Sequence, residues 1–149
     1  MQSNKILPPT YLLTAIILIV ILHLLLPIAT LIPSPWTLLG IIPLAVGIIF
    51  AVSAEQTFRE ANTAVCPFDA SSTLVTHGLY RFTRNPMYLG SALILFGVSI
   101  LLGSLTPYII VFVFALLIDR MFIQMEERKL AITFGEQYEE YKSQTRRWL

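Results

Sequence analysis

The sequence predicts an all-α integral membrane protein with four membrane-spanning helices, organised as a single domain over residues 1–149. Two observations support this fold class. Hydrophobic residues make up 56% of the chain and charged residues only 13%, whereas soluble domains are about 45–50% apolar. The apolar residues also gather into four runs, close to the roughly 17–25 residues that a helix needs to cross a bilayer. We therefore expect the chain to fold in contact with membrane lipid.

Each apolar run is expected to form one span. The runs cover about residues 11–32, 36–54, 86–102 and 107–123. The links between the first and second runs and between the third and fourth carry no charge, which predicts two tight hairpins. Lys5 precedes the first run as in a secretory signal. That run is about twice as long as a signal's apolar region and lacks a clear cleavage site, so we interpret it as a retained span.

The charges of the chain predict its orientation. All ten Lys and Arg residues lie before the first span, between the second and third, or at and after the end of the fourth. Because positively charged loops face the cytoplasm, both termini and the polar segments 55–85 and 124–149 are predicted on that side. The formal net charge of +1 gives no reason to expect nucleic acid as a partner. The single cysteine, Cys66, excludes an intramolecular disulfide and a multi-cysteine metal site, and we expect no metal.

The first polar segment should begin as a continuation of the second helix and break around residues 62–67. It runs into the third span through HGLYRFTRNPMYLG, residues 77–90. Asn85 is a favoured helix N-cap and Pro86 suits the first helical position, so the third helix is predicted to begin there. Arg84 adds a full charge beside the positive end of this helix, and together they would attract an anion.

Other polar side chains of this stretch could hydrogen-bond or stack beside such an anion: His77, Tyr80 and Tyr88. Arginine and tyrosine side chains also anchor membrane helices at the interface without binding any ligand. The local chemistry leaves both interpretations open.

The second polar segment is predicted to extend the fourth helix out of the membrane. Glu126 and Glu127 are adjacent and point about 100° apart, so one can face inward while the other faces water. Gly135 is expected to end this helix. Residues 136–148 are predicted to form a short amphipathic helix at the membrane surface. Its interfacial aromatic residues would be Tyr138, Tyr141 and Trp148.

Taken together, the two polar segments resemble the isoprenylcysteine carboxyl methyltransferase family and, more broadly, the phospholipid methyltransferase-like membrane enzymes. The resemblance rests on HGLYRFTRNPMYLG, an apolar hairpin, and then EERKL, FGEQY, EEY and RRW in this order. It covers roughly the C-terminal half, and the first half is similar only in having two spans. The resemblance implies an enzyme that transfers a methyl group from S-adenosylmethionine to an amphipathic or lipid-like acceptor, with the cofactor in a cytoplasm-facing pocket.

By position, the resemblance implies two sets of site residues. The acidic pair Glu126 and Glu127 would complete the pocket and supply any catalytic base. The implied cofactor-binding residues are His77, Gly78, Tyr80, Arg84, Asn85, Pro86, Tyr88, Glu127, Tyr138, Tyr141 and Arg146. The chemistry agrees, since Arg84 suits the carboxylate of the cofactor and either glutamate suits its ammonium. Tyr80 or Tyr88 could stack on the adenine.

Two positions depart from the family pattern. Many relatives have histidine where this chain has Asn85, and asparagine cannot carry a proton at neutral pH. Members that methylate isoprenylcysteine place an arginine where this chain has Phe122, and Arg120 lies on a different helix face. This weakens a prenylcysteine carboxylate as the acceptor and favours a phospholipid amine, another small amine or a thiol. An amine or thiol must lose a proton, which Glu126 or Glu127 could accept.

Two other functions stay open at this point. NADPH-dependent sterol reductases have a distantly similar C-terminal membrane region, and a non-catalytic binding or assembly protein could keep the same fold. His23 is an ionisable group within a span, which marks a functional candidate. We interpret it instead as a neutral histidine that is hydrogen-bonded to a neighbouring helix.

Overall fold

The computed structural model describes residues 8–61 and 72–149. These residues are helical, with two isolated bridges and no strand among them. Cys66 and the predicted break around residues 62–67 lie outside the described part of the chain. The all-α prediction is confirmed for the part that is described.

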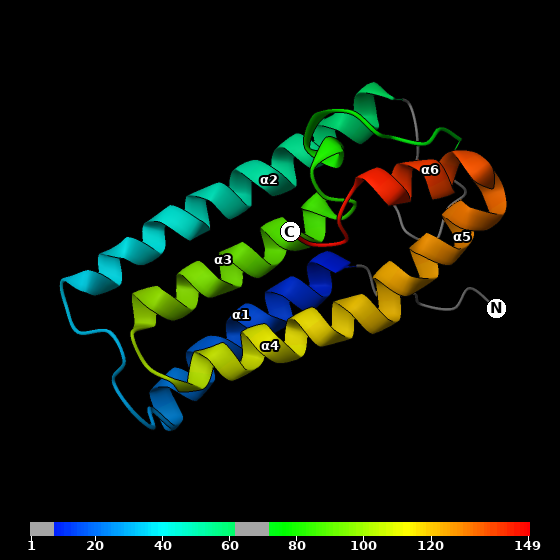
Figure 1. Ribbon diagram of the computed structural model, residues 1–149. Helices are drawn as coiled ribbons and strands as arrows, with labels where there is room; N and C mark the ends of the chain where they lie inside the picture. Colours follow the sequence, from blue (N-terminus) through cyan, green and yellow to red (C-terminus); the bar gives the residue numbers. More distant parts are fainter. Residues whose placement is uncertain (1–7, 62–71) are drawn as a thin grey trace.

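The described residues form a helical bundle with a polar cap at one end. The elements are α1 (Pro8–Leu25), η1 (Trp36–Gly40), α2 (Ile41–Glu60), η2 (Gly78–Arg81), α3 (Pro86–Leu102), α4 (Thr106–Ile118), η3 (Asp119–Ile123), α5 (Gln124–Phe134) and α6 (Glu136–Gln144). The short η1 and η2 are 3₁₀ helices, whereas η3 is a π-helical turn. Figure 1 shows α5 and α6 at the end of the bundle where α2 finishes and α3 begins.

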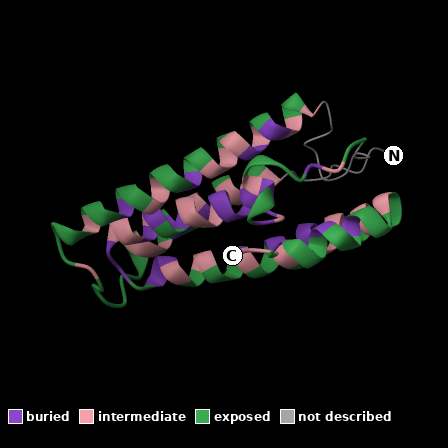
Figure 2. Cartoon of the chain, turned by 45° about the horizontal axis from the view of Figure 1, so that its top comes forward, coloured by how far each residue is buried: buried purple, intermediate pink, exposed green. Residues whose placement is uncertain are grey.

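Three helices are long and apolar enough to cross a membrane: Pro8–Leu25, Trp36–Glu60 and Thr106–Phe134. The fourth, α3, has only 17 residues, or about 26 Å at 1.5 Å per residue, against a hydrocarbon core of about 30 Å. It is also the helix that packs against α1, α2 and α4 alike. Figure 2 shows buried residues concentrated on the inward faces and exposed ones on the outer faces of α1, α2 and α4. The outer faces are apolar, as expected for contact with lipid.

Glycines set the distance between α2 and α3. Gly47 lies against Gly90, and Gly40 lies against Gly97. A Cβ atom added at Gly47 would stand 2.6 Å from the carbonyl oxygen of Gly90, and one added at Gly40 would stand 2.5 Å from that of Gly97. Small residues at such contacts allow membrane helices to pack backbone to backbone. Gly40 ends η1 directly before α2, so glycines seven residues apart occur on both sides of this contact. This spacing is a signal visible in the sequence.

The first helix is shorter than predicted, because it ends at Leu25 rather than near residue 32. Pro27 explains this, since proline lacks an N–H donor and disfavours helical geometry at the residue before it. The link to η1 is therefore not a tight hairpin. It pairs with the link between α3 and α4 through Leu31 N–H to Gly103 O (2.8 Å) and Leu105 N–H to Ala29 O (2.9 Å).

The link between α3 and α4 is short, as predicted. Gly103 ends α3 in the left-handed conformation, with φ of 73°. His23 Nδ1 lies 2.8 Å from the hydroxyl of Ser104, so the predicted hydrogen bond of this histidine exists but its partner is in the link, not on a helix. Thr106 donates its hydroxyl proton to the carbonyl of Leu26. These contacts close the bundle at the end opposite the polar cap.

The last helix differs from its prediction. Gly135, with φ of 50°, ends α5 as expected, but α6 stops at Gln144 instead of continuing to Trp148. Tyr138 and Tyr141 are buried and do not face a membrane surface, and Trp148 packs against the main core. The reason is that α6 folds back over η2, where the hydroxyl of Tyr141 donates to the carbonyl of Tyr80 at 2.7 Å.

The glycine contact can be tested by substituting Gly47 with valine. Its side chain would meet the backbone of α3, so we expect the helices to separate and the folded fraction to fall, at a cost of at least about 1–3 kcal/mol. Thermal unfolding in detergent measures the effect. Ile48→Val, at an exposed position of the same helix, is the control and should keep the wild-type midpoint; equal loss in both variants would contradict the packing argument.

Candidate functional site

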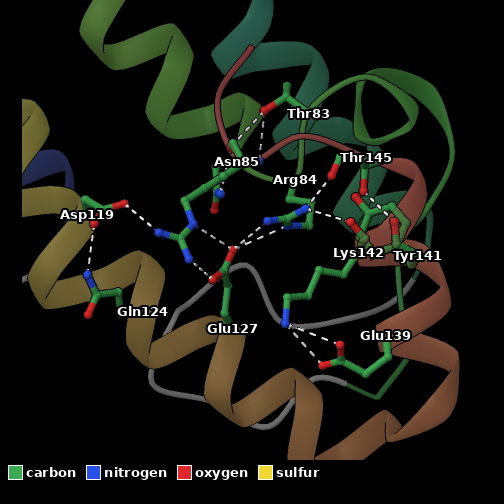
Figure 3. Close-up of polar contacts among 11 residues, drawn as sticks. Thr83, Arg84, Asn85, Asp119, Gln124, Glu127, Glu139, Tyr141, Lys142 and Thr145 are labelled. Carbon is green, nitrogen blue, oxygen red and sulfur yellow. Dashed lines mark hydrogen bonds and ion pairs between the residues drawn. The ribbon is translucent and has the colours of Figure 1, made fainter.

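The centre of the polar cap is Glu127, whose carboxylate is held by two arginines (Figure 3). Arg84 approaches through Nε at 3.3 Å and Nη2 at 3.2 Å, both to Oε1. Arg147 donates from Nε to Oε1 at 3.1 Å and from Nη2 to Oε2 at 2.6 Å. The side chains of Arg84 and Glu127 are only 11% and 12% exposed. The pair therefore lies where water screens it little, and charge-assisted hydrogen bonds are strong there.

All three guanidinium nitrogens of Arg84 donate within the protein. Besides Glu127, its Nη1 donates to the carbonyl of Lys142 at 3.1 Å and to that of Thr145. Its backbone N–H donates to the carbonyl of Arg146 at 2.8 Å. The predicted free charge at the start of α3 is therefore not free, because this guanidinium binds the end of α6 and the segment after it.

Asn85 occupies the N-cap position and Pro86 the first position of α3, as predicted, but the Asn85 side chain makes no capping hydrogen bond. Its Nδ2 instead donates to the carbonyl of Arg147 at 3.0 Å. The hydroxyl of Thr83 donates to the same carbonyl at 3.1 Å. The capping prediction is wrong because a carbonyl of the C-terminal segment is within reach of this side chain. We call residues Thr145–Trp148 the strap, since they run across the start of α3.

Two site residues were missed by the sequence analysis: Asp119 and Arg147. Asp119 lies in the π-helical turn, where its Oδ1 is 3.5 Å from Nη1 of Arg147 and its Oδ2 accepts from Gln124 at 2.9 Å. Hydrogen bonding to Glu127 raises the pKa of Arg147. Arg146, which the family pattern implied, has an exposed side chain and contacts Arg84 through its backbone. The run RRW offers no sequence signal that distinguishes the two arginines.

A cavity of about 340 Å³ opens between α5, α6 and the strap. Its walls include Gln124, Glu127, Arg128, Tyr138, Lys142 and Arg147. The hydroxyl of Tyr138 is buried, and it has no hydrogen-bond partner among the described residues. Burial raises the pKa of Tyr138 to about 12, so this phenol remains a neutral donor. Buried polar atoms are nearly always paired, so this unpaired hydroxyl, on a residue that lines the cavity, is a candidate ligand contact.

Glu126 belongs to a different group of residues. It accepts a hydrogen bond from the hydroxyl of Tyr88 at 2.6 Å. The Tyr88 ring lies 6.3 Å from that of Phe122, which makes an edge contact with Tyr11 at 5.3 Å. Both glutamates are partly exposed: Glu127 lines the charged cavity, and Glu126 turns inward to Tyr88. The two acidic side chains therefore contact different partners: Glu126 contacts Tyr88, and Glu127 contacts the two arginines.

Phe122 is a core residue in this fold. It is 2% exposed and belongs to the main apolar cluster, whereas Arg120 is exposed at the surface. Arg120 therefore does not take the place of an arginine at position 122.

The remaining predicted residues lie around η2. Tyr80 is buried against Phe58, with ring centres 5.2 Å apart, and burial raises the pKa of its phenol. His77 and Gly78 are exposed. Gly78 has φ of 63°, and a Cβ atom there would stand 3.3 Å from the hydroxyl of Thr57. These residues do not join the charged cluster. Within residues 8–61 and 72–149, no group of three or more His, Cys, Asp or Glu side chains is arranged to hold a metal ion.

Comparison with known proteins shows which family the chain belongs to. Residues 35–137 match the family described as phospholipid methyltransferase. The chain is 34% identical over 94 residues to the protein-S-isoprenylcysteine O-methyltransferase of Schizosaccharomyces pombe, covering 61% of this chain and 38% of that enzyme. It is also 40% identical over 63 residues to an uncharacterized protein of Haemophilus influenzae, covering 42% of this chain and all of that protein. The family match includes Arg84, Glu126 and Glu127 and ends before Tyr138 and the strap.

The two buried tyrosines of α6 give a matched test of these contacts. Tyr141→Phe removes the hydrogen bond to Tyr80, which should cost about 1 kcal/mol and lower the unfolding midpoint by about 2–4 °C for a chain of this size. Tyr138→Phe removes a hydroxyl that has no partner, so we expect the midpoint of the ligand-free protein to stay the same or rise. Thermal unfolding in detergent measures both. A larger loss for Tyr138→Phe than for Tyr141→Phe would show that the contacts are misassigned.

Proposed function

The chain belongs to the phospholipid methyltransferase family, and from this premise we propose that it is a membrane methyltransferase that uses S-adenosylmethionine as the methyl donor and an amphipathic, lipid-like molecule as the acceptor. The observation that carries the proposal is the family match over residues 35–137. This range contains Arg84 and Glu127, which form a buried ion pair. We further propose that the polar cap faces the cytoplasm, because the basic residues of the described part of the chain lie at that end.

The cavity suits the amino-acid end of the donor, which carries an ammonium and a carboxylate. Glu127 offers a carboxylate to the ammonium, while Lys142 and Arg147 offer cations to the carboxylate. The buried hydroxyl of Tyr138 offers a further donor, which has no hydrogen-bond partner among the described residues. When bound, S-adenosylmethionine supplies an electrophilic methyl group on its sulfonium. Arg84 then acts by holding Glu127 in place, since all three of its guanidinium nitrogens already donate within the protein.

Glu126 is the better placed of the two glutamates to accept a proton from the acceptor. Both oxygens of Glu127 are engaged by guanidinium groups, whereas Glu126 accepts a hydrogen bond from a neutral phenol, that of Tyr88. Tyr88 and Phe122 are buried beside it, so water has little access to this side of the site. We propose that Glu126 takes the proton of an amine or thiol acceptor, while Tyr88 fixes the orientation of its carboxylate.

The same geometry bears on the class of acceptor. In the ionised form that a base requires, Glu126 would repel a carboxylate acceptor. Phe122 is buried and Arg120 is exposed, so neither offers a cation beside Tyr88. This supports an amine or thiol over a prenylcysteine carboxylate. The name of the yeast relative describes methylation of S-isoprenylcysteine, and here a prenylcysteine remains the alternative acceptor to be assayed.

Ligand binding tests the donor. S-adenosylhomocysteine, the product left after methyl transfer, should raise the unfolding midpoint of the purified protein in detergent. At a ligand concentration 100 times Kd, the stabilisation should be about 2.7 kcal/mol. Arg84→Ala and Glu127→Ala should each weaken this response by at least about tenfold in Kd, and Tyr138→Phe should weaken it without lowering the midpoint of the ligand-free protein.

The control for these substitutions is Arg120→Ala, which removes an exposed arginine from the same continuous helix. It should bind S-adenosylhomocysteine like the wild type. NADPH should give no stabilisation, which separates the proposal from a sterol-reductase-like function. If S-adenosylhomocysteine has no effect on the wild type over a wide concentration range, the proposed function is wrong.

The role of Glu126 has its own test. Glu126→Gln can still accept the hydrogen bond of Tyr88 but cannot take a proton at neutral pH. We expect the rate of methyl transfer to an amine or thiol to fall by about 10²–10⁴-fold, while Kd for S-adenosylhomocysteine stays near that of the wild type. A labelled methyl donor, assayed against phospholipid amines, small amines, thiols and prenylcysteine, measures turnover. Undiminished transfer by Glu126→Gln would exclude this residue as the base.

A further inference from the structure

Arg147 lies between two carboxylates of one continuous helix. Its Nη2 is 2.6 Å from Oε2 of Glu127, and its Nη1 is 3.5 Å from Oδ1 of Asp119. Glu127 and Arg147 line the cavity, whereas Asp119 is not among its walls. Asp119 therefore contacts the guanidinium from behind, on the side away from the space where a ligand would bind.

The π-helical turn explains why the two carboxylates face the same arginine. Asp119 and Glu127 are eight positions apart in the sequence, and a regular α-helix at about 100° per residue would leave them about 80° apart. A π-helical turn rotates less per residue than an α-helix does. It therefore brings the side chains of Asp119 and Glu127 toward one face of the helix. Gln124 donates to Oδ2 of Asp119 at 2.9 Å, a contact five residues along the chain. This leaves Oδ1 directed at Arg147.

The backbone of Arg147 is fixed independently of its side chain. Its carbonyl accepts from Thr83 and Asn85, and Thr83 also pairs with Arg146 in a short bridge. The Arg147 side chain is 40% exposed, far more than that of Arg84 at 11%. The position of its guanidinium thus depends on the two carboxylates rather than on packing.

We propose that Asp119 is a positioning residue that keeps the guanidinium of Arg147 in the cavity when the ammonium of a bound amino-acid group takes its place on Glu127. This rests on the proposed function, since the ligand is the zwitterionic end of the methyl donor. The ammonium and Arg147 compete for the same carboxylate. Without Asp119, a guanidinium released from Glu127 would turn to solvent. With Asp119, it stays beside the cavity and donates to the carboxylate of the ligand.

The geometry also identifies Arg147, and not Arg146, as the arginine that the C-terminal segment contributes to the site. The side chain of Arg146 is exposed and only its backbone contacts Arg84. Position 147 lies beyond the residues that match the family. The assignment therefore comes from contacts in this chain, not from the family pattern.

The test is a double-mutant cycle on the affinity for S-adenosylhomocysteine, measured by titration calorimetry on the full chain in detergent. Asp119→Asn keeps the size of the side chain but removes its charge. It should raise Kd by about 3- to 10-fold, the effect expected from freeing one long side chain at a binding site. Arg147→Ala should raise Kd by at least about tenfold. In the Arg147→Ala background, Asp119→Asn should have no further effect.

Two comparisons sharpen the result. Arg120→Ala, next to Asp119 but exposed, should bind like the wild type. Arg146→Ala should weaken binding less than Arg147→Ala, and an equal loss would overturn the assignment. The unfolding midpoint of each ligand-free variant shows whether it folds. If Asp119→Asn does not fold, Asp119→Ala replaces it in the cycle.

The possible outcomes separate the two proposals. If the wild type binds S-adenosylhomocysteine and Asp119→Asn binds equally well, the proposed function stands and the positioning role is overturned. The same conclusion follows if Asp119→Asn weakens binding as much in the Arg147→Ala background as in the wild type, because Asp119 would then act without Arg147. If the wild type does not bind, the proposed function fails and the positioning role fails with it.

Discussion

The polar cap depends on one constraint, the burial of the Glu127 carboxylate among cations that come from distant parts of the chain. Glu127 is 12% exposed, and its partner Arg84 lies 43 residues earlier in the sequence. A carboxylate taken out of water is costly unless charge and hydrogen bonds compensate it. Two guanidiniums do so here, and the second belongs to the strap. The start of α3, the first turns of α5 and the C-terminal residues are thus held together by one anion.

The bundle itself could be predicted well from the sequence, whereas the cap could not. The length of an apolar run indicates how many residues can lie in lipid. The number and approximate positions of these runs agree with the helices observed. Pro27 moved one boundary by several residues, an effect that local rules explain afterwards. The choice of ion-pair partners depends on how helices far apart in sequence are rotated relative to each other. No local pattern shows that Glu127 meets Arg147 and not Arg146, because the two adjacent arginines have the same chemistry.

The tyrosines of α6 show a second limit of sequence reasoning. A helix with aromatic residues at positions 138 and 141 has an apolar face, and either a membrane surface or the protein itself could cover it. The deciding fact is a backbone carbonyl of η2, at Tyr80, that can accept the hydroxyl of Tyr141. Asn85 illustrates the same point, since its side chain binds the carbonyl of Arg147 instead of capping α3. In both cases a tertiary partner replaced the local one that the sequence favoured.

In the proposed function, the two adjacent glutamates would let one short helical turn serve both the donor and the acceptor. Consecutive helical residues point about 100° apart, and the structure uses that angle to direct Glu127 toward the charged cavity and Glu126 toward Tyr88 and the apolar core. A polar, cationic surrounding suits the amino-acid end of a water-soluble donor. A carboxylate beside buried aromatic side chains suits a proton transfer from an acceptor that arrives through lipid. Because both side chains start from the same turn of α5, the two carboxylates keep a fixed angle to each other. The π-helical turn directly before them sets the rotation of this pair relative to α4.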